Sequence, residues 1–360
     1  MKTEMAGDIG FEIDFLAVGE GERSGDAIAI RYGSAAAGYQ VGIIDGGTKD
    51  SGEQLVEHVR RYYGTKTVDW VLNTHPDGDH SSGLTVIVER LAVRRLWMHR
   101  PWDHAEEILH LFHDGRITDD SLEARIRDAL NAAHDLEQTA IARRVPIDEP
   151  FEGQQIGPFY VMSPSRDWYQ TLIPQFRGTP EPVEAFQRVL AKALEAVKKA
   201  SAAAVEWVGE TMNIETLREG GETSAENESS VVLYSPNLGG KRIFLTGDAG
   251  IQALERAADF AARCGTALDS LDLVQIPHHG SRRNVSPSLL GRVMGKTAYI
   301  SAAKDDAEHP RRVVTNAFKR RGARVYATKG NGLRHHFNIG DRDGWGPAQE
   351  LPFYDRVEAY

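Results

Sequence analysis

One stretch of the chain decides the fold, because an apolar strand runs directly into a loop dense in metal-binding side chains. It reads Val68-Asp69-Trp70-Val71-Leu72-Asn73, followed by Thr74-His75-Pro76-Asp77-Gly78-Asp79-His80. Imidazole and carboxylate groups bind divalent cations, and a tight loop at a strand end can point several of them at one place. The pattern predicts a metal site formed by His75, Asp77, Asp79 and His80.

Two further loops have the same character. Asp248 follows a strand expected at residues 242–246, and His278-His279-Gly280-Ser281 follows a strand expected at residues 271–276. Taken alone, Asp248 is explained equally well as a helix N-cap. Strand ends on one side of a layered sheet converge on a common cleft, so the three loops support one another.

The composition is that of an ordinary globular protein. The chain has 360 residues, of which 41% are hydrophobic and 26% charged. It has no run of roughly eighteen apolar residues, the length that spans a bilayer, and its acidic N-terminus is unlike a secretory signal. The single cysteine, Cys264, excludes an intramolecular disulfide. We therefore expect a soluble, cytoplasmic protein that does not act at a membrane.

Charge is spread unevenly along the chain. The net charge of −10 argues against nonspecific coating of nucleic acid. Between residues 280 and 335, however, thirteen Lys and Arg stand against three acids, which leaves +10 here and −20 elsewhere. This segment is either a solvated basic surface or a rim that attracts anions. The asymmetry mildly favours a phosphate-containing substrate.

Strand and helix signals alternate along most of the chain. Short apolar stretches predict strands in the first hundred residues and again after residue 230, with helices between them. Residues 100–145 and 181–220 are instead charge-rich and helical in composition. We expect one domain over residues 1–360 that carries these two helical insertions.

The motifs resemble those of a known family. The loop from His75 to His80 is similar to the HxHxDH signature of the metallo-beta-lactamase superfamily, with Asp77 in place of the second histidine. Other segments resemble one branch, the hydrolase domain of ComEC-type DNA-uptake channels and its soluble relatives. They are residues 15–21 with Gly25-Asp26-Ala27, Ile44-Asp45-Gly46-Gly47, Thr246-Gly247-Asp248, Ile276-Pro277-His278-His279-Gly280-Ser281 and residues 322–328. The resemblance implies an α/β fold, the αββα sandwich of two facing mixed β-sheets flanked by helices.

The resemblance also implies a site with two divalent metal ions. It assigns His75 and Asp77 to the first metal and Asp79 and His80 to the second. Asp248 would lie between the two metals. His278 would complete the second metal site, with His279 as the alternative ligand. Asp45 matches an aspartate that more often supports the ligand loop than binds metal.

One ligand of the family pattern is missing. Many members have a further histidine just before the strand that begins here near Ser230, where this chain has Glu226 and Asn227. One of these side chains, or water, would take its place. An aspartate at position 77 makes the ligand set harder, which shifts the preference from zinc toward manganese or magnesium.

The implied chemistry is hydrolysis by a hydroxide that bridges the two metals. Asp79 and His279 are the candidate catalytic residues, with His309 behind them as a second proton donor to the leaving group. The candidates for substrate binding share the basic segment that begins at the His278 loop: Ser281, Arg282, Arg283 and Lys304.

A phosphodiesterase or nuclease that acts on nucleic acid or a nucleotide is therefore the expected function. Two alternatives remain at the level of sequence. The same metals could hydrolyse an ester, a lactam or a thioester, or the protein could be a noncatalytic metal-binding scaffold that uses its helical insertion for interaction. Manganese-dependent cleavage of a phosphodiester separates the first hypothesis from the last.

Overall fold

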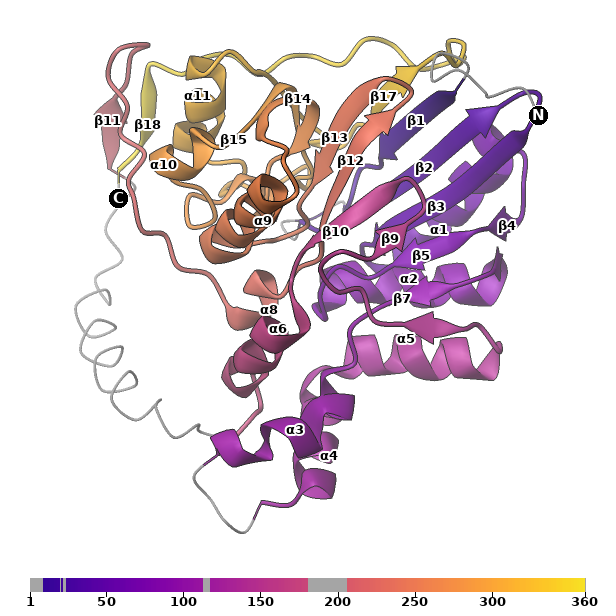
Figure 1. Cartoon of the computed structure of the whole chain (residues 1–360). Helices are drawn as coiled ribbons and strands as arrows, with labels where there is room; N and C mark the ends of the chain where they lie inside the picture. Colours follow the sequence, from indigo (N-terminus) through magenta and orange to yellow (C-terminus); the bar gives the residue numbers. More distant parts are fainter. Residues whose placement is uncertain (1–8, 20, 22–23, 113–116, 181–205, 360) are drawn as a thin grey trace.

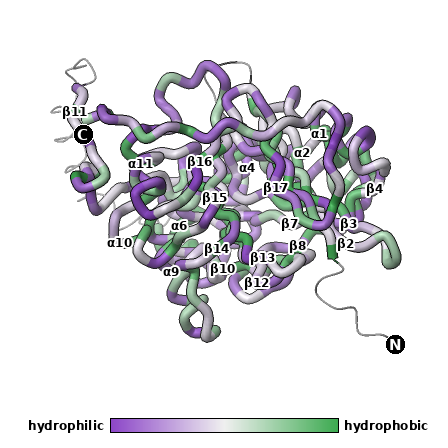
Figure 2. Tube along the Cα trace, turned by 90° about the horizontal axis from the view of Figure 1, so that it is seen from above, coloured by the Kyte–Doolittle hydropathy of each residue, from purple (hydrophilic) through white to green (hydrophobic). Residues whose placement is uncertain are grey.

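The computed structural model describes residues 9–19, 21, 24–112, 117–180 and 206–359. Two large β-sheets face each other, and helices cover the outer side of each (Figure 1). This confirms the expected fold class, the αββα sandwich. Hydrophobic and hydrophilic segments alternate along the chain, and the segment labelled β17 (Leu333–Phe337) is largely hydrophilic (Figure 2).

The first sheet has seven strands in the order β17-β1-β2-β3-β5-β7-β8. Strands β17 to β3 are antiparallel, and β5, β7 and β8 add in parallel to β3. The strands are β1 (Gly10–Phe15), β2 (Ala27–Ser34), β3 (Gly38–Gly46), β5 (Trp70–Leu72), β7 (Leu96–Trp97), β8 (Ile147–Asp148) and β17 (Leu333–Phe337).

The second sheet also has seven strands, in the order β16-β15-β14-β13-β12-β10-β9. Strands β13 to β16 are parallel, whereas β12, β10 and β9 add in antiparallel fashion. The strands are β9 (Gln155–Ile156), β10 (Phe159–Ser163), β12 (Val232–Leu238), β13 (Lys241–Leu245), β14 (Leu268–Gln275), β15 (Val293–Ile300) and β16 (Arg324–Ala327).

Helices follow the strands of both sheets. Those beside the first sheet are α1 (Lys49–His58, continued by a π turn, Val59–Tyr63), α2 (Gly78–Arg90) and α5 (Asn131–Ala142). Those beside the second sheet are α9 (Ile251–Arg263), α10 (Pro287–Leu290) and α11 (Arg312–Arg320). The remaining helices are α3 (Ala105–Ile108), α4 (Asp119–Ala129), α6 (Arg166–Leu172) and α8 (Ala225–Glu228), with two small strand pairs, β4 (Thr67–Val68) with β6 (Ala92–Val93) and β11 (Trp207–Gly209) with β18 (Arg356–Glu358).

The space between the sheets is filled by side chains from strands and their flanks alone. Strand β1 shows the pattern, because Phe11, Ile13 and Phe15 are fully buried in this inner core. Alternate residues of a strand point to opposite faces, so Glu12 and Asp14 lie on the other face of β1. They are buried as well, and the guanidinium groups of Arg334 and Arg342 pair with them.

Helix α2 packs unusually close to its neighbours through glycine. A Cβ atom on Gly83 would lie 1.9 Å from the carbonyl oxygen of Gly46 and 2.6 Å from that of Thr48. No other residue fits this contact without moving the backbone. The close approach fixes the first turn of α2, which contains Asp79 and His80, against the end of β3.

The two expected insertions differ in the structure. Residues 101–111 and 119–142 are helical, in five short segments. Most of the second insertion, residues 181–205, lies outside the described residues. Its described remainder forms strand β11 and turns, so the helix expected up to residue 220 is wrong there. Trp207 pairs with Glu358 of β18, and such long-range pairing overrides local helix propensity. No helix among the described residues is long and apolar enough to cross a membrane.

Candidate metal centre

The candidate ligands lie at one edge of the sandwich. Asp45 ends β3, His75 follows β5, Asp248 follows β13, and the two histidines of the 278–279 loop follow β14. Strands β3 and β5 are parallel, and so are β13 and β14. The carboxyl ends of strands in each sheet therefore bring these residues together, as expected from the three loops.

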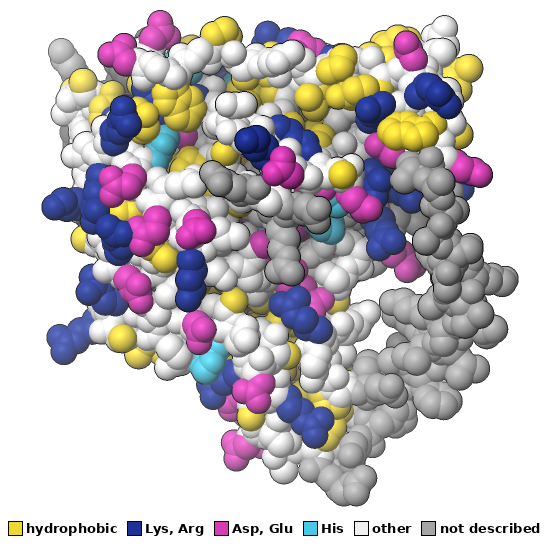
Figure 3. Space-filling view, turned by 180° about the vertical axis from the view of Figure 1, so that it is seen from behind, with side chains coloured by type: hydrophobic (Ala, Val, Ile, Leu, Met, Phe, Trp, Pro, Cys, Tyr) yellow, Lys and Arg dark blue, Asp and Glu magenta, His cyan; other side chains and the backbone are white. Residues whose placement is uncertain are grey.

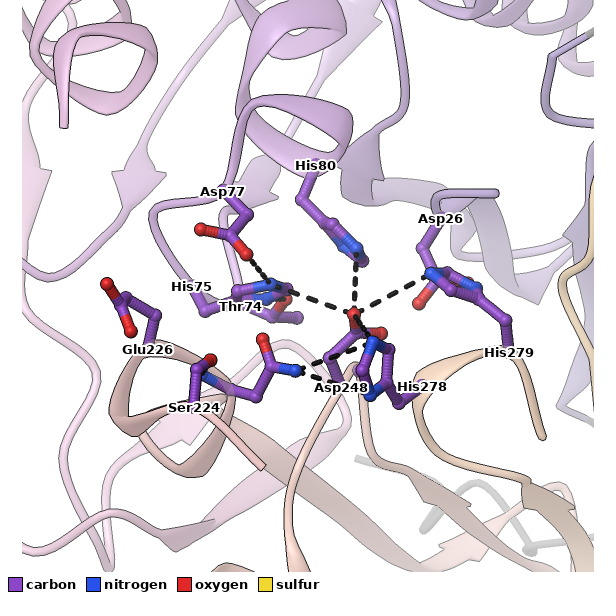
Figure 4. A network of polar contacts seen from close by, with 12 residues as sticks. Asp26, Thr74, His75, Asp77, His80, Ser224, Glu226, Asp248, His278 and His279 are labelled. Atoms are coloured by element: carbon purple, nitrogen blue, oxygen red, sulfur yellow. Dashed lines mark hydrogen bonds and ion pairs between the residues drawn. The ribbon is translucent and has the colours of Figure 1, made fainter. Parts of the chain in front are cut away.

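The centre of the site is the Asp248 carboxylate (Figure 4). Its Oδ2 atom lies within 4 Å of the Nε2 atoms of four imidazoles: His80 at 3.4 Å, His279 at 3.6 Å, His278 at 3.8 Å and His75 at 3.9 Å. All four rings present the same nitrogen to one carboxylate.

Several of these buried atoms lack a hydrogen-bond partner among the described residues. They are Nε2 of His75, Nε2 of His80 and Oδ1 of Asp248. Buried polar atoms are nearly always hydrogen-bonded, so three unpartnered ones that converge require an explanation. Imidazole nitrogen and carboxylate oxygen are the donors that divalent cations take in proteins. The residues present therefore fit a bound metal ion.

Each imidazole is oriented through its other nitrogen. The Nδ1 atom of His80 lies 2.7 Å from Oδ2 of Asp45, and Nδ1 of His75 lies 3.0 Å from Oγ1 of Thr74, which itself donates to Asp45 at 2.6 Å. A proton held on Nδ1 leaves the Nε2 lone pair free for a metal, the usual arrangement behind histidine ligands. Asp45 thus holds two of the four rings, as a supporting residue.

The same holds for the loop after β14. Nδ1 of His279 lies 3.0 Å from the carbonyl oxygen of Ser301, and Nδ1 of His278 lies 3.0 Å from Oδ1 of Asn284. Both histidines have positive φ, 47° for His278 and 56° for His279. Backbone strain of this kind is concentrated at functional sites, and it allows two neighbouring rings to approach one carboxylate.

Electrostatics keep Asp248 ionised. Burial raises the pKa of this carboxyl, but the charges of His279, His80 and His278 outweigh burial and hold the pKa well below its usual range. Burial lowers the pKa of His80, and Asp248 and Asp45 together raise it well above its usual value. Both shifts have one cause, the mutual attraction between the buried carboxylates and the imidazoles around them.

Two further aspartates lie close to His80. Asp79 can place a carboxylate oxygen within 4.8 Å of ligand atoms of His80 and His279, and Asp26 can do so with His80 and Asp248. Sequence reasoning gave Asp26 no role. Its signal lay in topology, because Asp26 precedes β2, which is antiparallel to β3, and so it lies at the same edge as the end of β3. Oδ1 of Asp26 is buried and has no hydrogen-bond partner among the described residues.

The other side of the site differs in its donors. Oδ2 of Asp77 lies 3.7 Å from Nε2 of His75, but Oδ1 of Asp77 accepts a hydrogen bond from the guanidinium of Arg177 at 2.6 Å. At the position of the missing histidine, the amide nitrogen of Asn227 lies 3.3 and 3.5 Å from the ring nitrogens of His278. Glu226 points away from Asp248 (Figure 4) and accepts from the backbone N–H of Arg177. Of the two residues left open by the sequence, Asn227 is the one at the centre.

The geometry separates the two neighbouring histidines. His279 has a side-chain exposure of 6% and belongs to a metal-compatible group with Asp79 and His80, whereas His278 has 28% and contacts Asn227. The arrangement favours His279 over His278 as the ligand that acts together with Asp79 and His80.

His309 lies beside this pair. Its ring centroid is 6.1 Å from that of His278 and 6.4 Å from that of His279. Its Nδ1 lies 3.2 Å from Oδ2 of Asp306. Burial lowers the pKa of His309, and the neighbouring Asp306 opposes that shift only in part.

The residues expected to bind substrate are not equivalent. Ser281 is buried and its Oγ accepts from the backbone N–H of Arg283. The guanidinium of Arg282 donates to the carbonyl oxygen of Ala359, so it fastens the C-terminal segment. Lys304 is exposed and follows β15 at the edge that holds the site. Lys304 is thus exposed at this edge, whereas the guanidinium of Arg282 is engaged with the C-terminal segment.

The basic segment is largely neutralised in space. Many of its arginines form ion pairs with acids from distant parts of the chain, among them Arg292 with Asp259, Arg320 with Glu210, Arg321 with Glu215 and Arg334 with Glu12. Acidic and basic side chains are interspersed on the face seen in Figure 3. A continuous anion-attracting rim is therefore not what this segment forms.

Part of the chain matches the model of a known family. Residues 22–161 match the model of the metallo-beta-lactamase superfamily. Over these residues the chain is similar to the metallo-beta-lactamase superfamily. The matched residues run from before β2 into β10 and include the whole ligand loop from His75 to His80. This match confirms the resemblance noted in the sequence. It implies a hydrolase that uses divalent metal ions, and the histidine–aspartate groups of the site supply ligands for them.

Two individual proteins are similar to this chain. One is ComE operon protein 3 of Bacillus subtilis (strain 168), 29% identical over 150 residues, which are 39% of this chain and 18% of that protein. The similarity thus spans less than a fifth of that relative. The other is the crystal structure of a long form RNase Z from yeast, with a TM-score of 0.37 and 9% identity, over 84% of this chain and 38% of that one. So low a structural similarity adds nothing to the assignment.

Proposed function

We propose that this protein is a cytoplasmic, metal-dependent phosphodiesterase of nuclease type. The observation that carries the proposal is the convergence of four imidazole nitrogens on Asp248, with buried lone pairs that have no hydrogen-bond partner among the described residues. Two donor sets flank this carboxylate. The inner set is Asp79, His80 and His279 with Asp248, and the outer set is His75, Asp77 and Asn227.

The chain's own residues have separate tasks. Divalent ions in the two sets would supply Lewis acidity toward a water molecule and the scissile bond. Asp45 keeps the rings of His80 and His75 in the tautomer that can bind metal. We propose His309, whose Nδ1 contacts Asp306, as the residue that passes a proton to the leaving group. The exposed ammonium group of Lys304 would attract the anionic part of the substrate.

Phosphodiesters fit this site better than esters or lactams for a chemical reason. Four carboxylates line it, from Asp26, Asp77, Asp79 and Asp248. Oxygen-rich sites favour manganese or magnesium over zinc, and these harder ions are the usual partners of phosphate oxygens. We therefore propose Mn²⁺ as the working ion, with Zn²⁺ or Mg²⁺ as the alternatives, and a nucleic acid or nucleotide as the substrate.

A panel assay on metal-depleted protein tests the proposal. The protein is reloaded with Mn²⁺, Zn²⁺ or Mg²⁺ and offered bis-p-nitrophenyl phosphate, single-stranded DNA and RNA, a p-nitrophenyl ester and a chromogenic lactam. We expect phosphodiester cleavage with Mn²⁺, reduced about 100-fold or more in Asp79→Ala. Asp305→Asn changes an exposed aspartate and serves as the matched control. Cleavage of the ester or lactam alone, or a folded protein that binds no metal, would contradict the proposal.

A further inference from the structure

In one of the two donor sets, the outer one, the aspartate is already paired with a guanidinium group. Arg177 donates from Nη1 to Oδ1 of Asp77 at 2.6 Å, while Oδ2 of the same carboxylate lies 3.7 Å from Nε2 of His75. Among the described residues, neither Asp79 nor Asp248 has a lysine or arginine partner. The outer set is thus the one whose carboxylate is already paired with a permanent cation.

Contacts with neighbouring residues hold Arg177 in this position. Its backbone N–H donates to Oε1 of the buried Glu226 at 2.7 Å, and its Nε donates to the carbonyl oxygen of Ala129 at 3.5 Å. The next residue, Gly178, has a φ of +75°, and a Cβ atom on it would lie 2.4 Å from Cβ of Ala129. Helices α4 and α8 therefore fix the backbone that carries this guanidinium to Asp77.

The rest of the outer set is weak as well. The end of the Asn227 amide that faces His278 is the nitrogen, which has no lone pair for a cation. Apart from His278, which is 28% exposed, the imidazole of His75 and the Asp77 carboxylate that Arg177 also binds remain. The inner set, by contrast, offers two imidazoles and two carboxylates, and three of these four residues are buried. The donors of the two sets are therefore clearly unequal.

We propose that Arg177 holds Asp77 as an internal counter-ion, so that the outer position binds its metal ion much more weakly than the inner position. This inference rests on the proposed function, because it presupposes that the site binds metal. A divalent ion that enters the outer set has to share Asp77 with the guanidinium or displace it. The chain then carries one tight metal ion, and the second binds only at higher metal concentration.

Metal binding itself tests the inference. Metal-depleted protein is titrated with Mn²⁺ alone, with bound ion measured by equilibrium dialysis and elemental analysis, and with electron paramagnetic resonance to detect coupled pairs. We expect one tight Mn²⁺ per chain in the wild type and a second that binds weakly. In Arg177→Gln the second ion should bind about three- to tenfold more tightly, the scale of a partly exposed ion pair, with the first unchanged.

Matched variants show whether the change in metal binding comes from the ion pair between Arg177 and Asp77. Arg166→Gln removes an arginine of nearly equal exposure, 51% against 49%, that pairs with Glu149 and not with the site; it should bind metal as the wild type does. Arg177→Lys keeps the charge and should keep the second ion weak. On an Asp77→Asn background, Arg177→Gln should have no further effect. If Arg177→Gln alone is poorly folded, the unequal affinity of the two Mn²⁺ ions in the wild type and in Arg177→Lys still tests the inference.

The possible results of the titration distinguish a failure of this inference from a failure of the proposed function. Two Mn²⁺ of equal affinity in the wild type, or unchanged binding in a folded Arg177→Gln, would overturn the inference. Unequal binding with no phosphodiester cleavage would leave this inference standing and refute the proposed function instead. A wild-type protein that binds no Mn²⁺ at all would refute both.

Discussion

Oδ2 of Asp45 lies 2.7 Å from Nδ1 of His80 and accepts the Thr74 hydroxyl at 2.6 Å, so one fully buried carboxylate orients the ligand loop. Asp45 itself has a φ of 53°, a conformation in which asparagine is tolerated. The backbone at the end of β3 is thus shaped to carry this residue beneath the metal centre.

Asp45→Asn tests this supporting role with the backbone conformation preserved. An amide cannot hold the proton of His80 on Nδ1 as an anion does, so the ring loses its fixed orientation. We expect the affinity for the tight Mn²⁺ to fall about 10- to 100-fold, the usual effect of changing a partner behind a ligand. Isothermal titration measures it. An unchanged affinity in a folded variant would show that Asp45 does not orient the ligand.

His279→Asn and His278→Asn form a matched pair that decides which ring is the inner ligand. Both residues have positive φ, so asparagine places the same demand on the backbone in each. We expect His279→Asn to weaken the tight Mn²⁺ by about 100-fold and His278→Asn by less than about tenfold. The reverse order, measured by equilibrium dialysis, would assign the ligand to His278.

Glu228 gives the metal-free protein a specific pH dependence. Its carboxylate accepts the backbone N–H of Ala253 at 2.8 Å, yet burial outweighs this hydrogen bond and raises the pKa of Glu228 to about 7. The folded state therefore holds the proton more tightly than the unfolded state, whose pKa is near the ordinary 4.5. Stability from this group is complete below pH 4.5 and is lost as pH rises toward 7.

Glu228→Gln should remove that dependence. Relative to the wild type, the variant should gain about 1–3 kcal/mol of stability between about pH 5 and pH 8. Urea unfolding of both proteins with chelator present measures the difference. A constant gap between variant and wild type over this range would mean that the carboxyl stays ionised in the folded protein.

Arg342 tests the buried ion-pair network on the far face of β1. Its guanidinium lies 2.7 Å from both Glu12 and Asp14, whose side chains are fully buried. Arg342→Ala should cost about 3 kcal/mol, because it leaves buried carboxylates short of a partner. Lys296→Ala removes a 74% exposed lysine that pairs with Asp272, and there we expect a loss below about 1 kcal/mol. Equal losses in chemical denaturation would contradict this account.

Much of the fold could be predicted from local sequence. Apolar alternation predicted strands of both sheets. The run from His75 to His80 indicated a metal site because all its ligand residues are neighbours in the chain. Strand β11 escaped prediction because Trp207 is held by pairing with Glu358 of β18, a contact that no local pattern contains.

Site residues could not be predicted from the sequence where their role depends on contacts between distant parts of the chain. Asp26 is a single acid before a strand, and only the antiparallel pairing of β2 with β3 brings it to the site. Asn227 and Glu226 are adjacent in the chain, and the short turn of α8 decides which one is directed to His278. Arg177 reaches Asp77 across a sequence separation of 100 residues. The basic segment misled for the same reason, because its acidic partners come from elsewhere in the chain.

Anomalous diffraction from crystals grown with Mn²⁺ tests the central claim most directly. At low Mn²⁺ concentration we predict one strong anomalous peak bounded by Asp79, His80, Asp248 and His279, and at high concentration a weaker second peak beside His75 and Asp77. No peak near Asp248 in crystals that contain Mn²⁺ elsewhere would contradict the assignment of this cluster as the metal centre.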